Sequence, residues 1–267
     1  MLEKPLNQAA GLLELAEPPA PKLMAVVSHG DEQSELPLLW RLCAALVDFG
    51  YAVTVLDGTT RESEANPGLE QYLENGYWTS DDKEDVPAWS IIPAGLGLRS
   101  LGSMADSQAQ TLAYLHQLFQ NEGIVLIYDS ADCLVPLLYD TGISPLLVLT
   151  PLRSSLITSY RSLKHLLLNG RLEPTIVEMA HRQGALPPNK LGNVANSLTE
   201  CAKNFLGYGL TALQIEAPFD DDRPCVDIQN LALRMLENTL QLSADCVSHP
   251  AQAGSLAHTS GQRVGSH

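Results

Sequence analysis

The stretch Leu23-Met24-Ala25-Val26-Val27-Ser28 is a short run of apolar, strand-favouring residues, and it decides the fold. A polar loop follows it. The next stretch, from about Glu35 to Phe49, carries apolar residues at helical spacing and stops at Gly50. Residues 52–57 are again short and apolar, which is typical of a second strand. The chain therefore begins with a predicted strand, loop, helix and strand.

The same alternation continues downstream. Further strands are predicted at residues 89–93, 124–129, 146–150, 175–179 and 211–217, and helices at 107–120, 154–168, 194–206 and 226–242, with another helix beginning at Cys133. These strands show little polar alternation, and most neighbours are separated by a helix. The pattern indicates an α/β fold with a doubly wound, mostly parallel sheet that is buried on both faces.

Three regions are expected along the chain. Residues 1–22 form an N-terminal segment with a Pro-rich linker, residues 23–243 the α/β domain, and residues 244–267 a disordered tail rich in Ser, Gly, Ala and His. Within the domain, the acidic stretch from Arg61 to Asp85 is expected to be a solvated loop with one short helix. An acidic docking surface for a basic partner is the alternative.

The composition of the chain disfavours several classes of function. The chain has 31 acidic and 16 basic side chains and a net charge of -15, which disfavours direct binding to nucleic acid or anionic lipid. No apolar run approaches the roughly 20 residues that span a bilayer, and no signal peptide is recognisable, so we expect a cytoplasmic protein without stable membrane insertion. The five cysteines include no C-x-x-C pair. They are expected to be reduced, with at least three buried.

The loop after the first strand is where an open parallel sheet would bind a ligand. A phosphate-binding loop needs several glycines, a lysine and a Ser/Thr for magnesium. Here the residues are His29, Gly30, Asp31, Glu32 and Glu35, with one glycine, no lysine and three carboxylates. We therefore expect a degenerate loop that binds no nucleotide cofactor, with ATP affinity weaker than about 1 mM.

Two aspartates end predicted strands. Asp57 and Asp129 stand where nucleotide-hydrolysing proteins keep carboxylates for magnesium or water, but aspartate there is also a turn initiator and helix cap. Without a phosphate-binding loop the structural role is favoured, and no catalytic residue is assigned. A hydrolase that uses them with His29 is the alternative. No G-x-S-x-G elbow is present, and no metal site is expected.

Seven segments between residues 6 and 242 carry a family resemblance through their order and spacing. They are Asn7 to Leu13, Leu42 to Asp57, Ile92 to Gly97, Tyr128 to Asp132, Thr150 to Lys164, Ala202 to Gly207 and Ala217 to Asp220. Together they resemble the MinD/ParA group of deviant Walker A ATPases, most closely the flagellar-number regulators FlhG and FleN. The family's Lys-Gly-Gly-x-Gly-Lys-Thr loop would cover His29 to Leu36, and none of its lysines is present. The resemblance therefore implies a MinD-like fold, and the departure from the family's loop predicts a catalytically inactive pseudo-ATPase.

The N-terminal segment carries the implied partner. In the family's Asp-Gln-Ala-x-x-Leu-Arg motif, Gln8, Ala9 and Leu12 match, whereas Asn7 and Leu13 depart. The resemblance implies that these residues bind the signal-recognition-type GTPase FlhF, with Gln8 stimulating GTP hydrolysis. It implies a role in flagellar number or placement, recruitment to the cell pole through a partner, and contacts with basal-body or transcription-regulator proteins. A companion of another system, such as cellulose secretion or pole positioning, is the alternative.

Overall fold

The computed structural model describes residues 20–75, 89–104, 107–120, 122–150, 153–179, 194–215 and 225–242. The strands are β1 (Lys22–Ser28), β2 (Val53–Asp57), β3 (Trp89–Pro93), β4 (Ile124–Ser130), β5 (Leu146–Leu149), β6 (Thr175–Met179), β7 (Ala212–Ile215) and β8 (Leu240–Gln241). The α-helices are α2 (Glu32–Asp48), α3 (Leu69–Asn75), α4 (Gly97–Met104), α5 (Gln108–Leu118), α6 (Ala131–Leu138), α7 (Arg153–His165), α8 (Val194–Cys201) and α9 (Val226–Glu237). Single π-helical turns, η1 (Leu166–Gly170) and η2 (Ala202–Leu206), extend α7 and α8.

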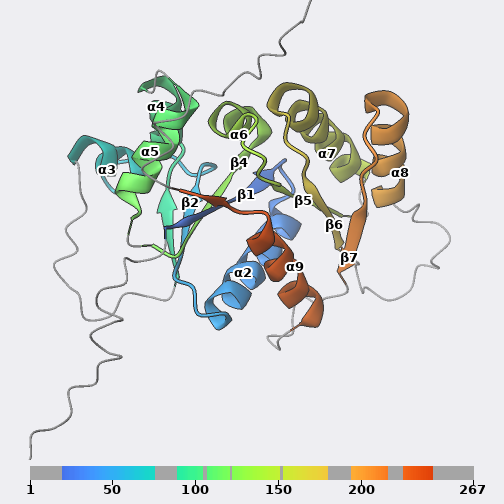
Figure 1. Ribbon diagram of the computed structural model, residues 1–267, viewed down its shortest axis with the longest axis horizontal. Coiled ribbons are helices and arrows are strands. Elements are labelled where there is room, and N and C mark those ends of the chain that lie inside the picture. Colours follow the sequence, from blue (N-terminus) through green and yellow to red (C-terminus); the bar gives the residue numbers. More distant parts are fainter. Residues whose placement is uncertain are drawn as a thin grey trace, which may run out of the picture.

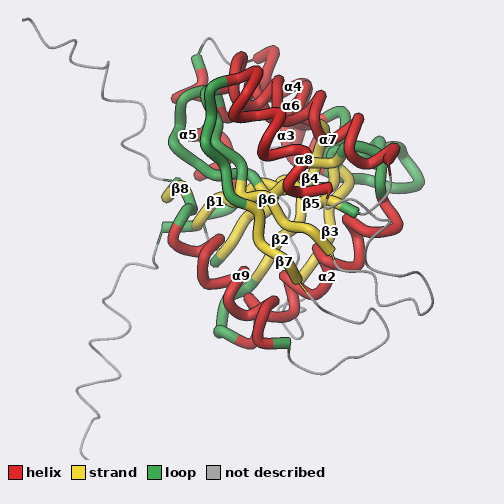
Figure 2. The backbone as a smooth tube through the Cα atoms, turned by 90° about the vertical axis from the view of Figure 1, so that its right-hand side faces the viewer, coloured by secondary structure: helices red, strands yellow, loops and turns green. Residues whose placement is uncertain are grey.

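The described strands form one eight-stranded sheet in the order β3-β2-β4-β1-β5-β6-β7, with β8 beside β1. Every pair along that path is parallel, and β8 alone among the described strands runs antiparallel to its neighbour. Helices α2 and α9 cover one face of the sheet, and α3 to α8 cover the other (Figure 1; Figure 2). The predicted doubly wound α/β fold is confirmed.

The alternation of side chains along β1 shows why the sheet is buried on both faces. Leu23, Ala25 and Val27 point into the core under α4 to α8, whereas Met24 and Val26 point into the core under α2 and α9. All five are at most 1% exposed. Because each fully buried large aliphatic side chain contributes about 1.5–3 kcal/mol, a strand that is apolar at every position is stable only in the middle of such a sandwich.

The last predicted helix is too long. α9 ends at Glu237 rather than Leu242, because Leu240 and Gln241 leave the helix and pair antiparallel with Leu23 and Lys22 of β1. α2, in contrast, begins at Glu32, three residues before the predicted start. α4 is not among the predicted helices. None of the described helices is both long and apolar enough to cross a membrane.

The described part of the acidic stretch is not simply a solvated loop. The Glu62 side chain is 6% exposed, and its carboxylate accepts hydrogen bonds from the backbone N–H groups of Leu96 at 2.6 Å and Gly97 at 2.8 Å. A third bond, at 3.3 Å, comes from the N–H of Glu70. The carboxylate therefore caps the N-terminus of α4 and ties the loop to α3 and α4, which corrects the solvated-loop prediction for this residue.

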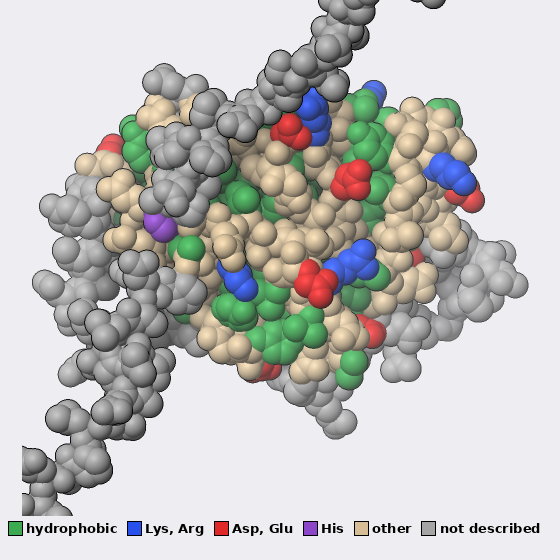
Figure 3. Space-filling view, viewed as in Figure 1, with side chains coloured by type: hydrophobic (Ala, Val, Ile, Leu, Met, Phe, Trp, Pro, Cys, Tyr) green, Lys and Arg blue, Asp and Glu red, His purple; other side chains and the backbone are tan. Residues whose placement is uncertain are grey.

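Charge on the surface is mixed on the face that Figure 3 draws. Acidic and basic side chains lie singly or in small groups there, among backbone and uncharged side chains, and apolar side chains gather in the lower part of the view (Figure 3). The predicted N-terminal segment up to residue 19 and the predicted C-terminal tail lie outside the described residues.

The four described cysteines are all free thiols, but only Cys43 is buried. Cys133, Cys201 and Cys225 are partly exposed, so the prediction of at least three buried thiols is wrong; Cys246 lies outside the described residues. The error arose because these three residues lie at the ends of short helices, where one side of the helix still faces solvent.

Thiol labelling of the native protein should separate these cysteines. Cys43 is expected to react slowest, because it is fully buried and burial raises its pKa to about 12, which leaves little of the reactive thiolate. Cys201 and Cys225 should react faster. Mass spectrometry of a labelling time course measures this, with protein in denaturant as the control. Labelling of Cys43 at the rate of Cys225 would contradict the packing of α2.

Candidate functional site

The carboxyl ends of β1, β2 and β4 bring the sequence-predicted positions to one edge of the sheet. Val27 pairs with Asp129 across β1 and β4, and Asp57 pairs with Tyr128 across β2 and β4. The loop after β1 is short, since α2 already begins at Glu32. Residues 29–31 are thus the whole connection between strand and helix.

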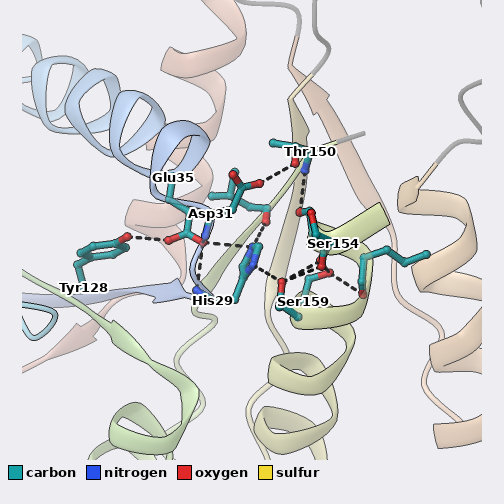
Figure 4. A network of polar contacts seen from close by, with 11 residues as sticks. His29, Asp31, Glu35, Tyr128, Thr150, Ser154 and Ser159 are labelled. Carbon is teal, nitrogen blue, oxygen red and sulfur yellow. Dashed lines mark hydrogen bonds and ion pairs between the residues drawn. The ribbon is translucent and has the colours of Figure 1, made fainter. Parts of the chain in front are cut away.

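Glu35 is the centre of this loop. Its carboxylate is fully buried and accepts hydrogen bonds from the backbone N–H groups of His29 at 3.0 Å and Asp31 at 3.1 Å, both to Oε1. Its other oxygen, Oε2, accepts a bond of 2.6 Å from the Tyr128 hydroxyl (Figure 4). Burial and the adjacent Glu35 raise the pKa of Tyr128, so this hydroxyl stays protonated and remains a donor.

His29 joins the loop to β5 and α7. Its Nε2 lies 2.7 Å from the carbonyl oxygen of Val148 and 3.3 Å from Glu35 Oε1, so Nε2 carries a proton that both acceptors attract. Its Nδ1 lies 2.9 Å from the hydroxyl of Thr158. The side chain is only 1% exposed. Both ring nitrogens therefore hold the loop in place rather than face a substrate.

Asp31 fixes the other side of the loop. Its Oδ2 accepts a hydrogen bond of 2.6 Å from the hydroxyl of Thr150, directly after β5. The backbone N–H of Thr150 in turn donates to the hydroxyl of Ser155 on α7, at 3.2 Å. Gly30, between the two anchors, has a φ of +90°, a conformation that L side chains rarely adopt. Glu32, at the start of α2, is exposed.

The arrangement has a direct chemical consequence. In an anion-binding loop, the backbone N–H groups before the helix point at the bound phosphate. Here two of those N–H groups already donate to a carboxylate of the same chain, and His29 and Tyr128 donate to it as well. The loop carries its own anion. An incoming phosphate would compete for the same donors and would meet a buried negative charge.

Asp57, at the end of β2, is engaged by the turn that follows it. Its Oδ1 accepts from the backbone N–H of Thr59 at 3.0 Å and from its hydroxyl at 2.6 Å, and Oδ2 accepts from the Thr60 hydroxyl at 2.7 Å. These are the contacts of a turn-initiating aspartate. Among the described residues, no group of three or more His, Cys, Asp and Glu side chains is placed to hold a metal ion.

Asp129, at the end of β4, is different. It is 4% exposed; Oδ1 accepts from the N–H of Ser130 at 2.6 Å, whereas Oδ2 is buried with no hydrogen-bond partner in the described part of the chain. Burial raises the pKa of this carboxyl, and the Ser130 N–H, the Cys133 thiol and the Arg99 charge offset part of that rise. The native state therefore holds this proton more tightly than the unfolded chain does.

This raised pKa makes a pH-dependent prediction for Asp129→Asn. In the wild type, Asp129 makes its full contribution to the free energy of unfolding below its ordinary pKa of 3.8. That contribution is lost as the pH rises through the raised pKa of the native state, because ionising Asp129 is harder in the folded protein. The variant lacks this loss, and each tenfold change in proton affinity is worth about 1.4 kcal/mol. Denaturant unfolding from pH 3 to pH 7 should show the variant gaining stability relative to wild type. A difference that stays constant with pH would contradict the assignment.

Sequence reasoning missed the partners of the loop. Tyr128 reads as a core residue of a buried strand, and Thr150 stands out only as part of a segment that carries the family resemblance. The structure brings them to the loop by hydrogen bonds that span 93 and 119 residues of sequence, respectively. The predicted partner-binding residues Asn7, Gln8, Ala9, Leu12 and Leu13 lie outside the described residues.

The fold and site define a doubly wound α/β protein whose loop between β1 and α2 is filled by its own carboxylate. Similar solved structures include a cobyrinic acid a,c-diamide synthase from Mycobacterium smegmatis, at 13% identity and a TM-score of 0.52, covering 81% of this chain and 94% of that one. At this identity the similarity concerns the fold alone.

Two further structures are similar at 14% identity and a TM-score of 0.47. One is a ParA family ATPase from Chlorobium tepidum TLS, covering 85% of this chain and 96% of that one. The other is the MinD cell division protein from Aquifex aeolicus, covering 83% of this chain and 100% of that one. No protein-family model matches the chain, and no curated protein matches it by sequence.

Proposed function

We propose that this protein is a catalytically inactive, nucleotide-independent member of the MinD/ParA group that regulates other proteins by binding them. One observation carries the proposal: the carboxylate of Glu35 accepts the backbone N–H groups of His29 and Asp31 that a nucleotide phosphate would need. To admit a phosphate, the loop would have to release a fully buried charge from its donors. No lysine in the loop from His29 to Leu36 would neutralise the added charge.

The cellular role that we propose is control of flagellar number or placement. The support is the N-terminal segment, in which Gln8, Ala9 and Leu12 match the motif by which FlhG-type regulators engage the GTPase FlhF. Gln8 would help to position the attacking water for GTP hydrolysis. Leu13 replaces the motif's arginine, so the complex would lack one charge-assisted contact. Companionship with another secretion or pole-positioning system remains the second proposal, and neighbouring genes distinguish the two.

Calorimetry with ATP and magnesium tests the first part. We expect no binding up to about 1 mM nucleotide, because the donors of the loop are occupied and its charge is of the wrong sign. A MinD-type ATPase titrated under the same conditions is the positive control. Micromolar, magnesium-dependent binding to this protein would overturn the proposal.

A pull-down with FlhF from the same host tests the second part. The full chain should bind FlhF and stimulate its GTP hydrolysis, and a chain that lacks residues 1–20 should do neither. Gln8→Ala should suppress the stimulation and leave binding largely intact, with Gln33→Ala as a control outside the segment. A full chain that neither binds FlhF nor changes its turnover would refute the flagellar role and leave the nucleotide-independent scaffold standing.

A further inference from the structure

A cleft lies beside the loop, on the α7 side of His29, and His29 and Gly30 are among its lining residues. It has a volume of about 530 Å³, and its lining includes Ser28 and Ser130, the paired last residues of β1 and β4. The first turn of α6 and one face of α7 line the rest. His29 joins the cleft to the loop, because its Nδ1 contacts Thr158, which lines the cleft. The volume is within the range of roughly 300–1,000 Å³ that is usual for small-molecule sites.

The face of α7 and η1 toward this cleft is polar throughout. Thr158, Arg161, His165 and Asn169 are spaced three or four residues apart, and Ser162 lies beside Arg161, which places all five on one side of the helix. Leu163, Leu166 and Leu167 bury the other side. The buried leucines form the side of α7 and η1 that packs on the sheet. The polar side chains on the other side therefore do not contribute to that packing.

Positive charge is concentrated in the cleft. Arg161, Lys164 and His165 line it together with a single acid, Asp132, whose carboxylate lies 3.6 Å from His165 Nε2. Within the described residues neither Arg161 nor Lys164 forms an ion pair. In a chain with 31 acidic and 16 basic side chains, two cations without a carboxylate partner in one cleft are conspicuous. The arrangement is suited to an anion from solution.

The start of α6 adds donors to the same cleft. Ser130, its N-cap residue, has an extended backbone and makes no side-chain cap, and Ser130, Ala131 and Asp132 all line the cleft. The first N–H groups of a helix and its dipole favour a negative charge at that point. Ala131 contributes the only apolar side chain among the described lining residues, so the cleft suits a compact polar ligand better than an acyl chain.

We propose that this cleft binds a compact phosphorylated ligand, with the phosphoryl group between Arg161 and Lys164 on α7 and the start of α6. The guanidinium of Arg161 suits two oxygens of one phosphoryl group, and Lys164 supplies a point charge. Ser28 and Ser130 line the same cleft. The ligand is either free phosphate or the phosphate monoester of a small polyol. The cleft shares His29 and Gly30 with the loop, but the phosphoryl group would be held from α6 and α7 and not by the loop N–H groups that Glu35 occupies.

Calorimetry with three probes tests the site: inorganic phosphate, pyrophosphate and glycerol phosphate. We expect submillimolar binding of at least one, weakening as the salt concentration rises. Tighter binding of glycerol phosphate than of inorganic phosphate would assign a monoester, and the reverse order would assign free phosphate. If none of the three probes bound at concentrations up to about 10 mM, the proposal would be overturned.

Paired variants locate the binding. The double variant Arg161→Ala, Lys164→Ala should weaken binding at least tenfold, whereas Arg61→Ala, Lys203→Ala removes the same charge from two exposed residues that do not line the cleft and should leave affinity nearly unchanged. All four side chains are exposed, so both proteins should fold. Equal losses in the two variants would mean that only net charge matters, and would overturn the site. If the phosphate site were refuted, the conclusion from the ATP titration would still stand.

Discussion

Glu35→Ala should lower the free energy of unfolding by about 3–5 kcal/mol, because it leaves three buried donors without an acceptor at about 1–3 kcal/mol each. The substitution leaves the N–H groups of His29 and Asp31 and the hydroxyl of Tyr128 without their acceptor in a region closed to water. Alanine is as good a helix former as glutamate, so helix propensity contributes little to the loss. Chemical denaturation at pH 7 measures the effect.

Two further variants distinguish the loss of the buried hydrogen-bond acceptor from the loss of a negative charge. Glu35→Gln keeps one carbonyl oxygen for the loop N–H groups, and Tyr128 can accept from the new amide, so the loss should be about 1–2 kcal/mol. Glu32→Ala removes an exposed acid one helical turn away and should lose only about 0.3–1 kcal/mol, from the helix dipole. If Glu35→Ala were no more damaging than Glu32→Ala, the carboxylate would not be the anchor of the loop.

The fold follows from local pattern because each strand is apolar at almost every position. Six buried residues in a row, as in Leu23 to Ser28, fit a central parallel strand, and a helix between successive strands permits parallel pairing. The end of α9 could not be found in this way. Leu240 and Leu242 continue a helical apolar pattern, and it is the pairing of Leu240 and Gln241 with β1 that makes the strand preferable.

The sequence could predict that the loop lacks the residues that bind phosphate, but not that the carboxylate of Glu35 takes the place of the phosphate. The missing lysine and glycines are visible in the residues from His29 to Leu36, and they predict a loop unsuited to phosphate. The same sequence gives no sign that Glu35 turns inward while Glu32 faces solvent. That difference depends on Tyr128, which lies on β4, beside β1 in the sheet, and donates to Glu35.

Gly58→Ala, directly after β2, is the second substitution with a large expected effect. A Cβ at this position would lie 2.1 Å from Asp129 Oδ2 and 2.3 Å from its Cγ, so the two strand ends would have to move apart. Asp129 cannot turn away easily because it is 4% exposed and its Oδ1 is held by the N–H of Ser130. The loss in unfolding free energy should reach about 3 kcal/mol, the upper part of the range for overpacking a core.

A double-mutant cycle shows whether the contact with Asp129 is the cause. In an Asp129→Gly background all three atoms that a Gly58 Cβ would meet are gone, so Gly58→Ala should then cost less than about 1 kcal/mol, and the coupling between the sites should be about 2 kcal/mol or more. Gly102→Ala is the matched control, because its Cβ would lie 3.9 Å from the nearest heavy atom, in the middle of α4. That change should stabilise the protein by about 0.5–1 kcal/mol. An equal loss for Gly58→Ala in both backgrounds would show that the backbone of the turn, and not Asp129, requires glycine. The cycle therefore tests whether Asp129 is held against the backbone of β2, the position that leaves its second oxygen buried and without a donor.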